Sequence, residues 1–246
     1  MTTLLVIAKE PRPGRVKTRL TPPFTPEEAA ALAEAALADT LSAVLATPAD
    51  RRVLVLDGAP GPWLPPGVEV VPQCAGGLDE RLAAAFADCT GPTLLIGMDT
   101  PQVTAELLTF GADFTDCDAW FGPAEDGGFW ALGLAEPDPA LLRGVPMSTP
   151  TTGALQRDRL TGAGLRVRDL PRLRDVDTAY DAWLVAEQVM VQGQGGRFAA
   201  EFDRLAAGVR RSDVEKSVAD RSAVEQSVAA RSVAEGSVVE RSVVGR

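Results

Sequence analysis

Short apolar runs alternate with longer stretches of helical spacing along most of this chain. Residues 3–8 (TLLVIA) form a continuous apolar run, which is typical of a strand buried on both faces of a parallel sheet. An alanine- and leucine-rich helix is expected over 26–46, with Thr25 as its N-cap and Glu28 completing a capping box. A strand, a loop and a helix therefore follow one another at the amino end.

The alternation continues further along the chain. Apolar runs predict strands at 52–56, 68–71, 93–97, 119–121 and 129–134. Helical spacing predicts helices at 78–89, 152–160, 179–191 and 197–209. This order indicates an α/β fold: one domain over residues 1–211 with a single doubly wound, mostly parallel sheet and right-handed crossovers.

Residues 212–246 have a different composition. A serine recurs every five positions, the charges nearly cancel, and no aromatic residue occurs. A period of five fits neither a helix nor a strand, and such a segment buries too little apolar surface to offset its ordering entropy. We expect a low-complexity tail that is disordered or weakly helical, with an interaction tail as the alternative.

Composition narrows the possible chemistry. The chain has no histidine, which removes Ser-His-Asp and Cys-His nucleophile systems and every histidine metal site. Its three cysteines, Cys74, Cys89 and Cys117, lack paired spacing and are expected to be reduced, buried thiols. Catalysis must then rest on carboxylates, lysine or arginine, and a hard oxygen-bound cation such as Mg²⁺ or Mn²⁺.

Charge and hydropathy bear on partners and location. The formal net charge of −10 argues against non-specific nucleic-acid binding, which needs a basic face. No run of about 18 apolar residues occurs, and the first positive charges follow the first apolar segment, the reverse of a signal peptide. We expect a cytoplasmic protein without nucleic-acid or membrane partners; its oligomeric state is left open.

A basic loop, residues 9–19, follows the first expected strand. It holds five basic residues within eleven positions, together with Gly14 and two prolines. Backbone N–H groups and cations in such a loop can surround a polyphosphate, at the place where α/β sheets bind ligands. The spacing of a P-loop is absent. The alternative is a solvated basic loop.

Asp99 comes directly after the expected strand 93–97. At the carboxyl end of a buried strand, its oxygens can hold Mg²⁺ against the phosphates of a nucleotide. The alternative is an N-cap for a helix that begins near Gln102.

Two later stretches carry further carboxylates. In residues 122–130 (GPAEDGGFW), glycines permit close backbone approach to a ligand, and Glu125 and Asp126 offer carboxylates to an acceptor; a plain hairpin turn has the same pattern. Asp175 and Asp177 point the same way in an extended segment, which suits a second metal ligand. Asp177 could instead cap the helix from residue 179.

These stretches, in this order, resemble a bacterial family with a GT-A-like, nucleotide-diphospho-sugar transferase fold, usually described as rSAM/selenodomain-associated transferase 1. The resemblance covers roughly residues 3–190 and rests on 8–20, 77–86, 96–101, 122–128 and 175–178. Residues 76–82 look like the Gly-Asp-Leu-Gly-Glu-Arg stretch of that family, with Asp79 at the position of the expected glycine.

The family is similar to the guanylyltransferases of molybdenum-cofactor and 2-phospholactate metabolism, which hold a nucleoside triphosphate on a basic first loop. The resemblance implies nucleotide contacts from Lys9, Gly14, Arg15, Lys17, Arg19, Gly77 and Arg81. It implies Mg²⁺ on Asp99 with Asp177 or Asp175. It implies an acceptor pocket at Pro123, Asp126, Gly127 and Gly128.

Together these features predict a Mg²⁺-dependent nucleotidyltransferase. A small anionic acceptor would attack the α-phosphorus of a nucleoside triphosphate and release pyrophosphate, with Mg²⁺, Lys17 and Arg15 neutralising charge and Asp99 holding the Mg²⁺. The first alternative is a glycosyltransferase that uses a nucleotide sugar, with Asp126 or Glu125 deprotonating the acceptor. The second is a nucleotide-binding module without catalysis.

Overall fold

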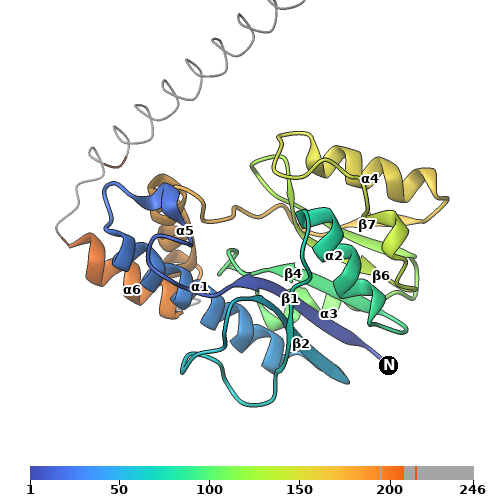
Figure 1. Cartoon of the computed structure of the whole chain (residues 1–246), viewed down its shortest axis with the longest axis horizontal. Coiled ribbons are helices and arrows are strands. Elements are labelled where there is room, and N and C mark those ends of the chain that lie inside the picture. Colours follow the sequence, from blue (N-terminus) through green and yellow to red (C-terminus); the bar gives the residue numbers. More distant parts are fainter. Residues whose placement is uncertain (194–195, 208–213, 215–246) are drawn as a thin grey trace, which may run out of the picture.

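The computed structural model describes residues 1–193, 196–207 and 214, and these form an α/β fold around one sheet (Figure 1). The sheet has seven strands in the order β3-β2-β1-β4-β6-β5-β7. The strands are β1 (Thr3–Lys9), β2 (Arg51–Asp57), β3 (Glu69–Pro72), β4 (Thr93–Gly97), β5 (Ala119–Pro123), β6 (Phe129–Leu134) and β7 (Val167–Asp169). Only β6 runs antiparallel to its neighbours, so the expected α/β, mostly parallel sheet is confirmed.

The central strand β1 is apolar on both faces because helices cover both. It pairs in parallel with β2 on one side and β4 on the other. Leu4 and Val6 enter one core cluster, whereas Leu5 between them enters the cluster on the opposite face. A continuous apolar run, rather than an alternating one, is what a strand in this position needs.

Four helices form the two outer layers (Figure 1). Buried residues of α1 (Pro26–Ala46) and α3 (Ala105–Gly111) belong to the first core cluster. Those of α2 (Leu78–Ala87) and α4 (Thr152–Gly162) belong to the second. The capping box of Thr25 and Glu28 is present at the start of α1, as the sequence predicts.

Helix α1 is, within the described part of the chain, the one helix that is long and apolar enough by length and composition to cross a membrane. However, 67% of its most apolar stretch is buried inside the protein. Its apolar residues face the sheet on one side and the helices α5 and α6 on another. The composition of α1 is therefore that of a core helix.

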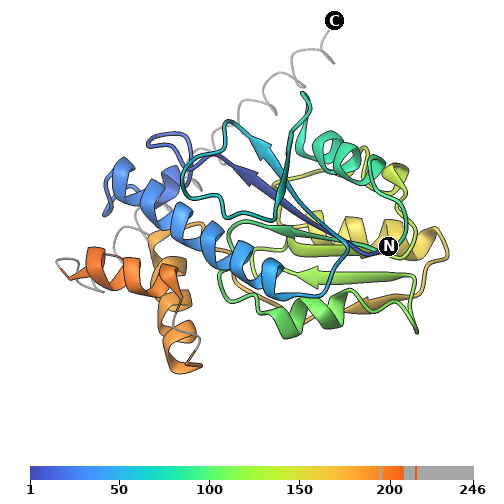
Figure 2. The ribbon, with the colours of Figure 1, turned by 90° about the horizontal axis from the view of Figure 1, so that it is seen from below.

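Two further helices, α5 (Ala179–Val191) and α6 (Arg197–Ala206), extend the fold beside α1 (Figure 2). They build a third apolar cluster with Leu20 and Phe24, which lie between the basic loop and α1. The Asp39 carboxylate of α1 accepts hydrogen bonds from the backbone N–H groups of Arg197 and Phe198, at 2.8 and 2.9 Å. These contacts fix the start of α6 against α1.

Several expectations need correction. The strand β7 was not predicted, because it is short and lacks a clear hydrophobic period. The helix considered near Gln102 begins later, at Ala105, as α3. Helix α2 ends at Ala87 and α6 at Ala206, before the predicted ends. Cys74 is exposed rather than buried, whereas Cys89 and Cys117 are buried free thiols. The expectation of a disordered tail concerns residues that lie almost wholly outside the described part.

Candidate active site

A cavity of about 480 Å³ opens at the carboxyl ends of β1 and β4. The chain leaves β1 toward β2 on one side, whereas β4 lies on the other side of β1. Such a switch point is where open α/β sheets bind their ligands, because the connecting loops diverge there. The basic loop, α2, the turn after β5, residues 147–152 and residues 175–177 all contribute to the lining.

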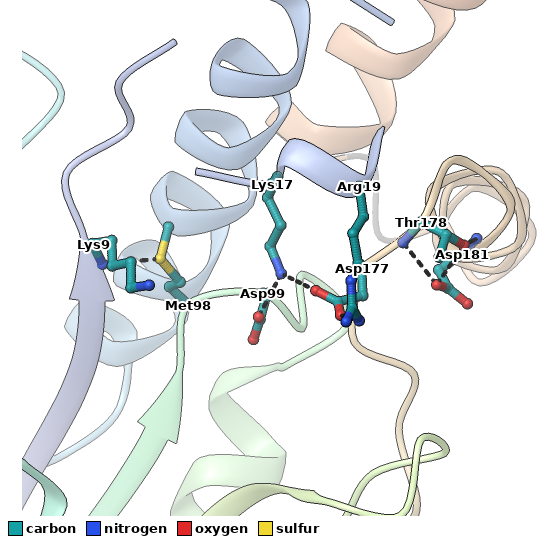
Figure 3. Close-up of polar contacts among 8 residues, drawn as sticks. All are labelled: Lys9, Lys17, Arg19, Met98, Asp99, Asp177, Thr178 and Asp181. Atoms are coloured by element: carbon teal, nitrogen blue, oxygen red, sulfur yellow. Dashed lines mark hydrogen bonds and ion pairs between the residues drawn. The ribbon is translucent and has the colours of Figure 1, made fainter. Parts of the chain in front are cut away.

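Lys17 lines this cavity, and its side chain points toward Asp99 and Asp177 (Figure 3). Its Nζ is 2.6 Å from an Asp99 carboxylate oxygen and 3.1 Å from one of Asp177. Lys17 adopts a left-handed backbone conformation (φ 48°, ψ 41°), which turns the chain into the short 3-10 helix at 18–20. Burial acts to lower the pKa of the ammonium, but the two carboxylates raise it well above its ordinary value. Lys17 is therefore a firmly charged cation inside the site.

Asp99 and Asp177 line the cavity and do not cap helices. Helix α3 begins at Ala105 and is capped by the Thr104 hydroxyl, so the expected helix start near Gln102 was wrong. Helix α5 is capped by Thr178, not by Asp177. Both alternative interpretations of these aspartates therefore fail.

The segment that carries Asp177 is fixed to the end of β4. The backbone N–H of Val176 donates a hydrogen bond to the Asp99 carbonyl at 2.9 Å. Arg19 approaches the second carboxylate oxygen of Asp177 at 3.1 Å. Burial acts to raise the pKa of Asp177, but Lys17 and Arg19 lower it below its ordinary value. Asp177 is thus an ionised group that two cations hold in place.

Asp175 lies in the same cavity without an ion-pair partner among the described residues. Burial, reinforced by Asp99, Asp126 and Asp177, raises its pKa to about 7. A carboxyl group with an elevated pKa in a cleft of like charges indicates a place where positive charge from outside the chain would be stabilised.

The three aspartates fit a hard divalent cation in donor chemistry, since Mg²⁺ and Mn²⁺ prefer carboxylate oxygens. In the described residues, no group of three or more His, Cys, Asp or Glu side chains is arranged to hold a metal ion. The Lys17 ammonium instead contacts Asp99 and Asp177 directly. A cation that used both carboxylates would need Lys17 to move.

Two further cations of the basic loop, Lys9 and Arg15, line the cavity, whereas Arg12 does not and pairs with Glu10. Lys9 and Arg15 are exposed, and neither forms an ion pair among the residues described. Arg81 from α2 also lines the cavity and contacts Asp57 at 3.1 Å. Gly14 and Gly77, which were expected to contact the nucleotide, are not among the lining residues. Gly14 makes a left-handed turn and Gly77 caps α2.

The turn after β5 serves two purposes. The strands β5 and β6 are antiparallel, so the turn is the hairpin connection that its glycines suggest. Asp126 and Gly128 nevertheless line the cavity, whereas Pro123 and Gly127 do not. Glu125 pairs with Arg174 and lines a smaller adjoining pocket, so of the two candidate carboxylates only Asp126 lines the main cavity.

Gly127 has a packing role instead of lining the cavity. Its φ is +90°, and an added Cβ would lie 2.1 Å from the Pro150 carbonyl oxygen. Its own carbonyl accepts a hydrogen bond from the Gly153 N–H at 2.8 Å. The glycines therefore let the hairpin lie directly against the segment that leads into α4.

Sequence reasoning missed the part of the lining that comes from this segment. Met147, Ser148, Thr149 and Thr152 all face the cavity. A run of hydroxyl residues before a helix was visible in the sequence, but nothing local connects it with the β5–β6 turn. Gln73 at the end of β3 was also missed, although its place after a strand could have identified it.

Comparisons with known proteins find similar sequences. Residues 31–149 match the family model described as "Uncharacterized protein conserved in bacteria (DUF2064)". The chain is 29% identical over 195 residues to the 2-phospho-L-lactate guanylyltransferase of Halorubrum lacusprofundi, covering 75% of this chain and 85% of that protein.

Solved structures show the same fold. A Desulfovibrio desulfuricans G20 protein, proposed to be a nucleotide-diphospho-sugar transferase, superposes with a TM-score of 0.74 at 26% identity, over 82% of this chain and 94% of that one. A Methanothermobacter nucleotidyl transferase superposes with a TM-score of 0.51 at 17% identity, over 78% and 99%. The second likeness concerns the fold alone.

Proposed function

We propose that this chain is a GT-A-like transferase of the nucleotidyltransferase type, which moves a nucleoside monophosphate from a nucleoside triphosphate to a small acceptor with Mg²⁺ or Mn²⁺ as cofactor. The observation that supports this most directly is the cluster of Lys17, Asp99 and Asp177 at the carboxyl ends of β1 and β4. A buried cation between two carboxylates, beside further cations at the mouth, suits a triphosphate with a divalent ion.

The basic loop would position the triphosphate. Lys9 and Arg15 are free to contact its β- and γ-phosphates from the mouth of the cavity. Lys17 would neutralise the charge that develops on the α-phosphate and on the departing pyrophosphate. When bound, a divalent ion supplies further neutralisation of the phosphate oxygens, and Asp99 with Asp177 or Asp175 would hold it.

The transfer itself is a displacement at phosphorus. An acceptor oxygen forms a bond to the α-phosphorus, the bond from that phosphorus to the bridging oxygen breaks, and the electron pair leaves with pyrophosphate. No covalent intermediate on the chain is needed, so a site without histidine can carry the reaction by positioning and charge neutralisation.

Glycosyl transfer is a second candidate, since the Desulfovibrio protein with the same fold is proposed to use a nucleotide sugar. In that reaction Asp126 would take the proton of the acceptor hydroxyl, because Asp126 lines the main cavity and Glu125 does not. Release of a nucleoside diphosphate from a nucleotide sugar would identify it. Release of pyrophosphate from a triphosphate would identify nucleotidyl transfer.

Ligand-dependent melting tests the proposal. A ligand at about 100 times its dissociation constant stabilises the folded state by roughly 2.7 kcal/mol, or about 5 to 10 °C for a domain of this size. We expect such a shift with Mg²⁺ and one nucleoside triphosphate, lost in Asp99→Ala and Lys17→Ala and kept in Arg166→Ala. Arg166 pairs with Asp118 outside the cavity and is a matched control. A shift with nucleotide sugars alone would favour glycosyl transfer; a shift with neither class would contradict the proposal.

A further inference from the structure

The basic residues that line the cavity come from other segments of the chain than the residues of one of its walls. Every basic residue that lines it comes from the basic loop or is Arg81 of α2. The opposite wall, which we call the acceptor wall, consists of the turn after β5, residues 147–152 and Asp175. Its lining residues include two carboxylates and three hydroxyls but no lysine or arginine.

The arginines around the acceptor wall are bound by other groups. Arg174 lines a smaller adjoining pocket that shares Asp126 and Asp175 with this cavity. Its guanidinium, however, pairs with Glu125 and with Asp181, the latter at 2.7 Å. Arg172 is exposed outside the lining and donates to the Ala124 carbonyl at 3.2 Å. Arg157 on α4 pairs with Asp169 at 3.0 Å. The carboxylate of Asp126 therefore has no cationic side chain as a partner among the residues described.

Two hydroxyl groups of this wall, those of Thr149 and Thr152, are held by hydrogen bonds. Thr152 is buried, and its hydroxyl donates to the Pro146 carbonyl at 2.8 Å. The Thr149 hydroxyl lies 3.2 Å from that of Thr152 and 3.1 Å from that of Thr151. Hydroxyls in such a chain can both donate to and accept from an alcohol, without favouring an anion.

The carboxylate of Asp126 is also held by a hydrogen bond. Its Oδ1 accepts a hydrogen bond from the Gly128 N–H at 2.7 Å, which orients the carboxylate. Among the described residues no partner is found for Oδ2, which leaves it able to accept a hydrogen bond from a substrate hydroxyl. Phe129 and Met147 add apolar surface to the same wall.

From this division we infer that the acceptor is a hydroxyl compound, neutral or cationic, that carries no phosphate or other anionic group at the end facing Asp126. This inference rests on the proposed function and replaces the expectation of an anionic acceptor. An anionic group placed here would meet carboxylates at short range in a cleft, where like charges repel more strongly than in water.

With a hydroxyl acceptor, the reaction also requires removal of the hydroxyl proton. The acceptor hydroxyl oxygen forms the bond to the α-phosphorus, the pyrophosphate leaves with the electron pair of the broken bond, and the hydroxyl proton passes to the Asp126 carboxylate and from there to solvent. No oxidant or further reactant is required.

A binding experiment with the full-length protein tests the inference. The protein is first loaded with Mg²⁺ and a non-hydrolysable triphosphate analogue, so that the basic loop is occupied. Glycerol 3-phosphate is then titrated by calorimetry into wild type, Asp126→Lys and Thr149→Lys. Both variants place a cation on the acceptor wall at side chains that are exposed or half-buried, and retained analogue binding shows that each is folded.

We expect no glycerol 3-phosphate binding to wild type at millimolar concentration and measurable binding to at least one lysine variant. Binding of glycerol 3-phosphate to wild type would overturn the inference, and so would a lack of binding to both folded variants. In either case the charge of the acceptor wall would not determine which ligand binds there. Failure of the analogue itself to bind wild type would instead contradict the proposed nucleotide-dependent function.

Discussion

The two sides of the cavity are built in different ways. The nucleotide side consists mainly of one continuous segment, residues 9–19, which follows directly on β1. The acceptor wall combines three segments that are distant in sequence and meet through backbone contacts such as Gly153 to Gly127. Charge that comes from one contiguous loop can be recognised in a sequence. A wall assembled by packing becomes visible only in the fold.

The largest expected effect is on the nucleotide side. Replacing Lys17 with methionine keeps a side chain of similar length but removes the charge beside Asp99 and Asp177. Loss of one preorganised group that stabilises transition-state charge lowers turnover by about 10² to 10³-fold. We expect a fall of this size in pyrophosphate release, with Arg166→Met near wild type. A wild-type rate in purified Lys17→Met would contradict the assignment of Lys17.

On the acceptor side, a substitution at Gly127 tests the close packing of the β5–β6 turn against Pro150. In Gly127→Ala the new methyl group would collide with the Pro150 carbonyl and force a left-handed alanine, whose strain alone costs about 1–3 kcal/mol. Gly164→Ala is the matched control, because Gly164 has a similar φ of +83° and nothing within 4 Å of an added Cβ. We expect a lower melting temperature in Gly127→Ala than in Gly164→Ala, and weaker acceptor binding with nucleotide binding retained. Equal melting of the two variants would show that the contact with Pro150 is unimportant.

A smaller effect concerns metal affinity in the absence of nucleotide. The Lys17 ammonium contacts the two carboxylates that a divalent cation would use, so cation and ammonium compete for them. We expect Lys17→Met to bind Mn²⁺ about tenfold more tightly than wild type, a difference of about 1.4 kcal/mol. Electron paramagnetic resonance of free Mn²⁺ measures this without turnover. Asp99→Asn, which removes a carboxylate ligand, should bind Mn²⁺ more weakly and serves as the reference. An unchanged Mn²⁺ affinity in Lys17→Met would show that Lys17 does not compete with the cation.

The same contrast explains how much could be predicted from the sequence. The ranges 93–97 and 129–134 for strands, and 26–46 and 179–191 for helices, agree with the structure because continuous apolar runs and capping residues are local signals. The predicted cluster of Lys17, Asp99 and Asp177 also comes together.

Other features could not be predicted, because they depend on packing between distant segments. The burial of Lys17 between carboxylates and the hydroxyls at 148–152 have no local signature. The strand β7 joins the edge of the sheet with only three residues, of which two are exposed. The contact of Gly127 with Pro150 likewise follows from how α4 packs against the hairpin.

The smallest expected effect comes from the contact that links the α2 side of the cavity with the loop before the acceptor wall. Asp79, in the first turn of α2, accepts a hydrogen bond from the Gly144 N–H at 2.8 Å. Asp79→Gly, which restores the residue expected from the resemblance, should lower the free energy of unfolding by about 0.5–1.5 kcal/mol. Asp79→Asn keeps the accepting oxygen and should recover most of that loss, as denaturant titration would show. If the link also positions residues 147–152, Asp79→Gly should raise KM for the acceptor and leave KM for the nucleotide unchanged. An equal rise in both constants would mean that Asp79 acts on α2 itself, and the two sides of the cavity would then not be separable at this contact.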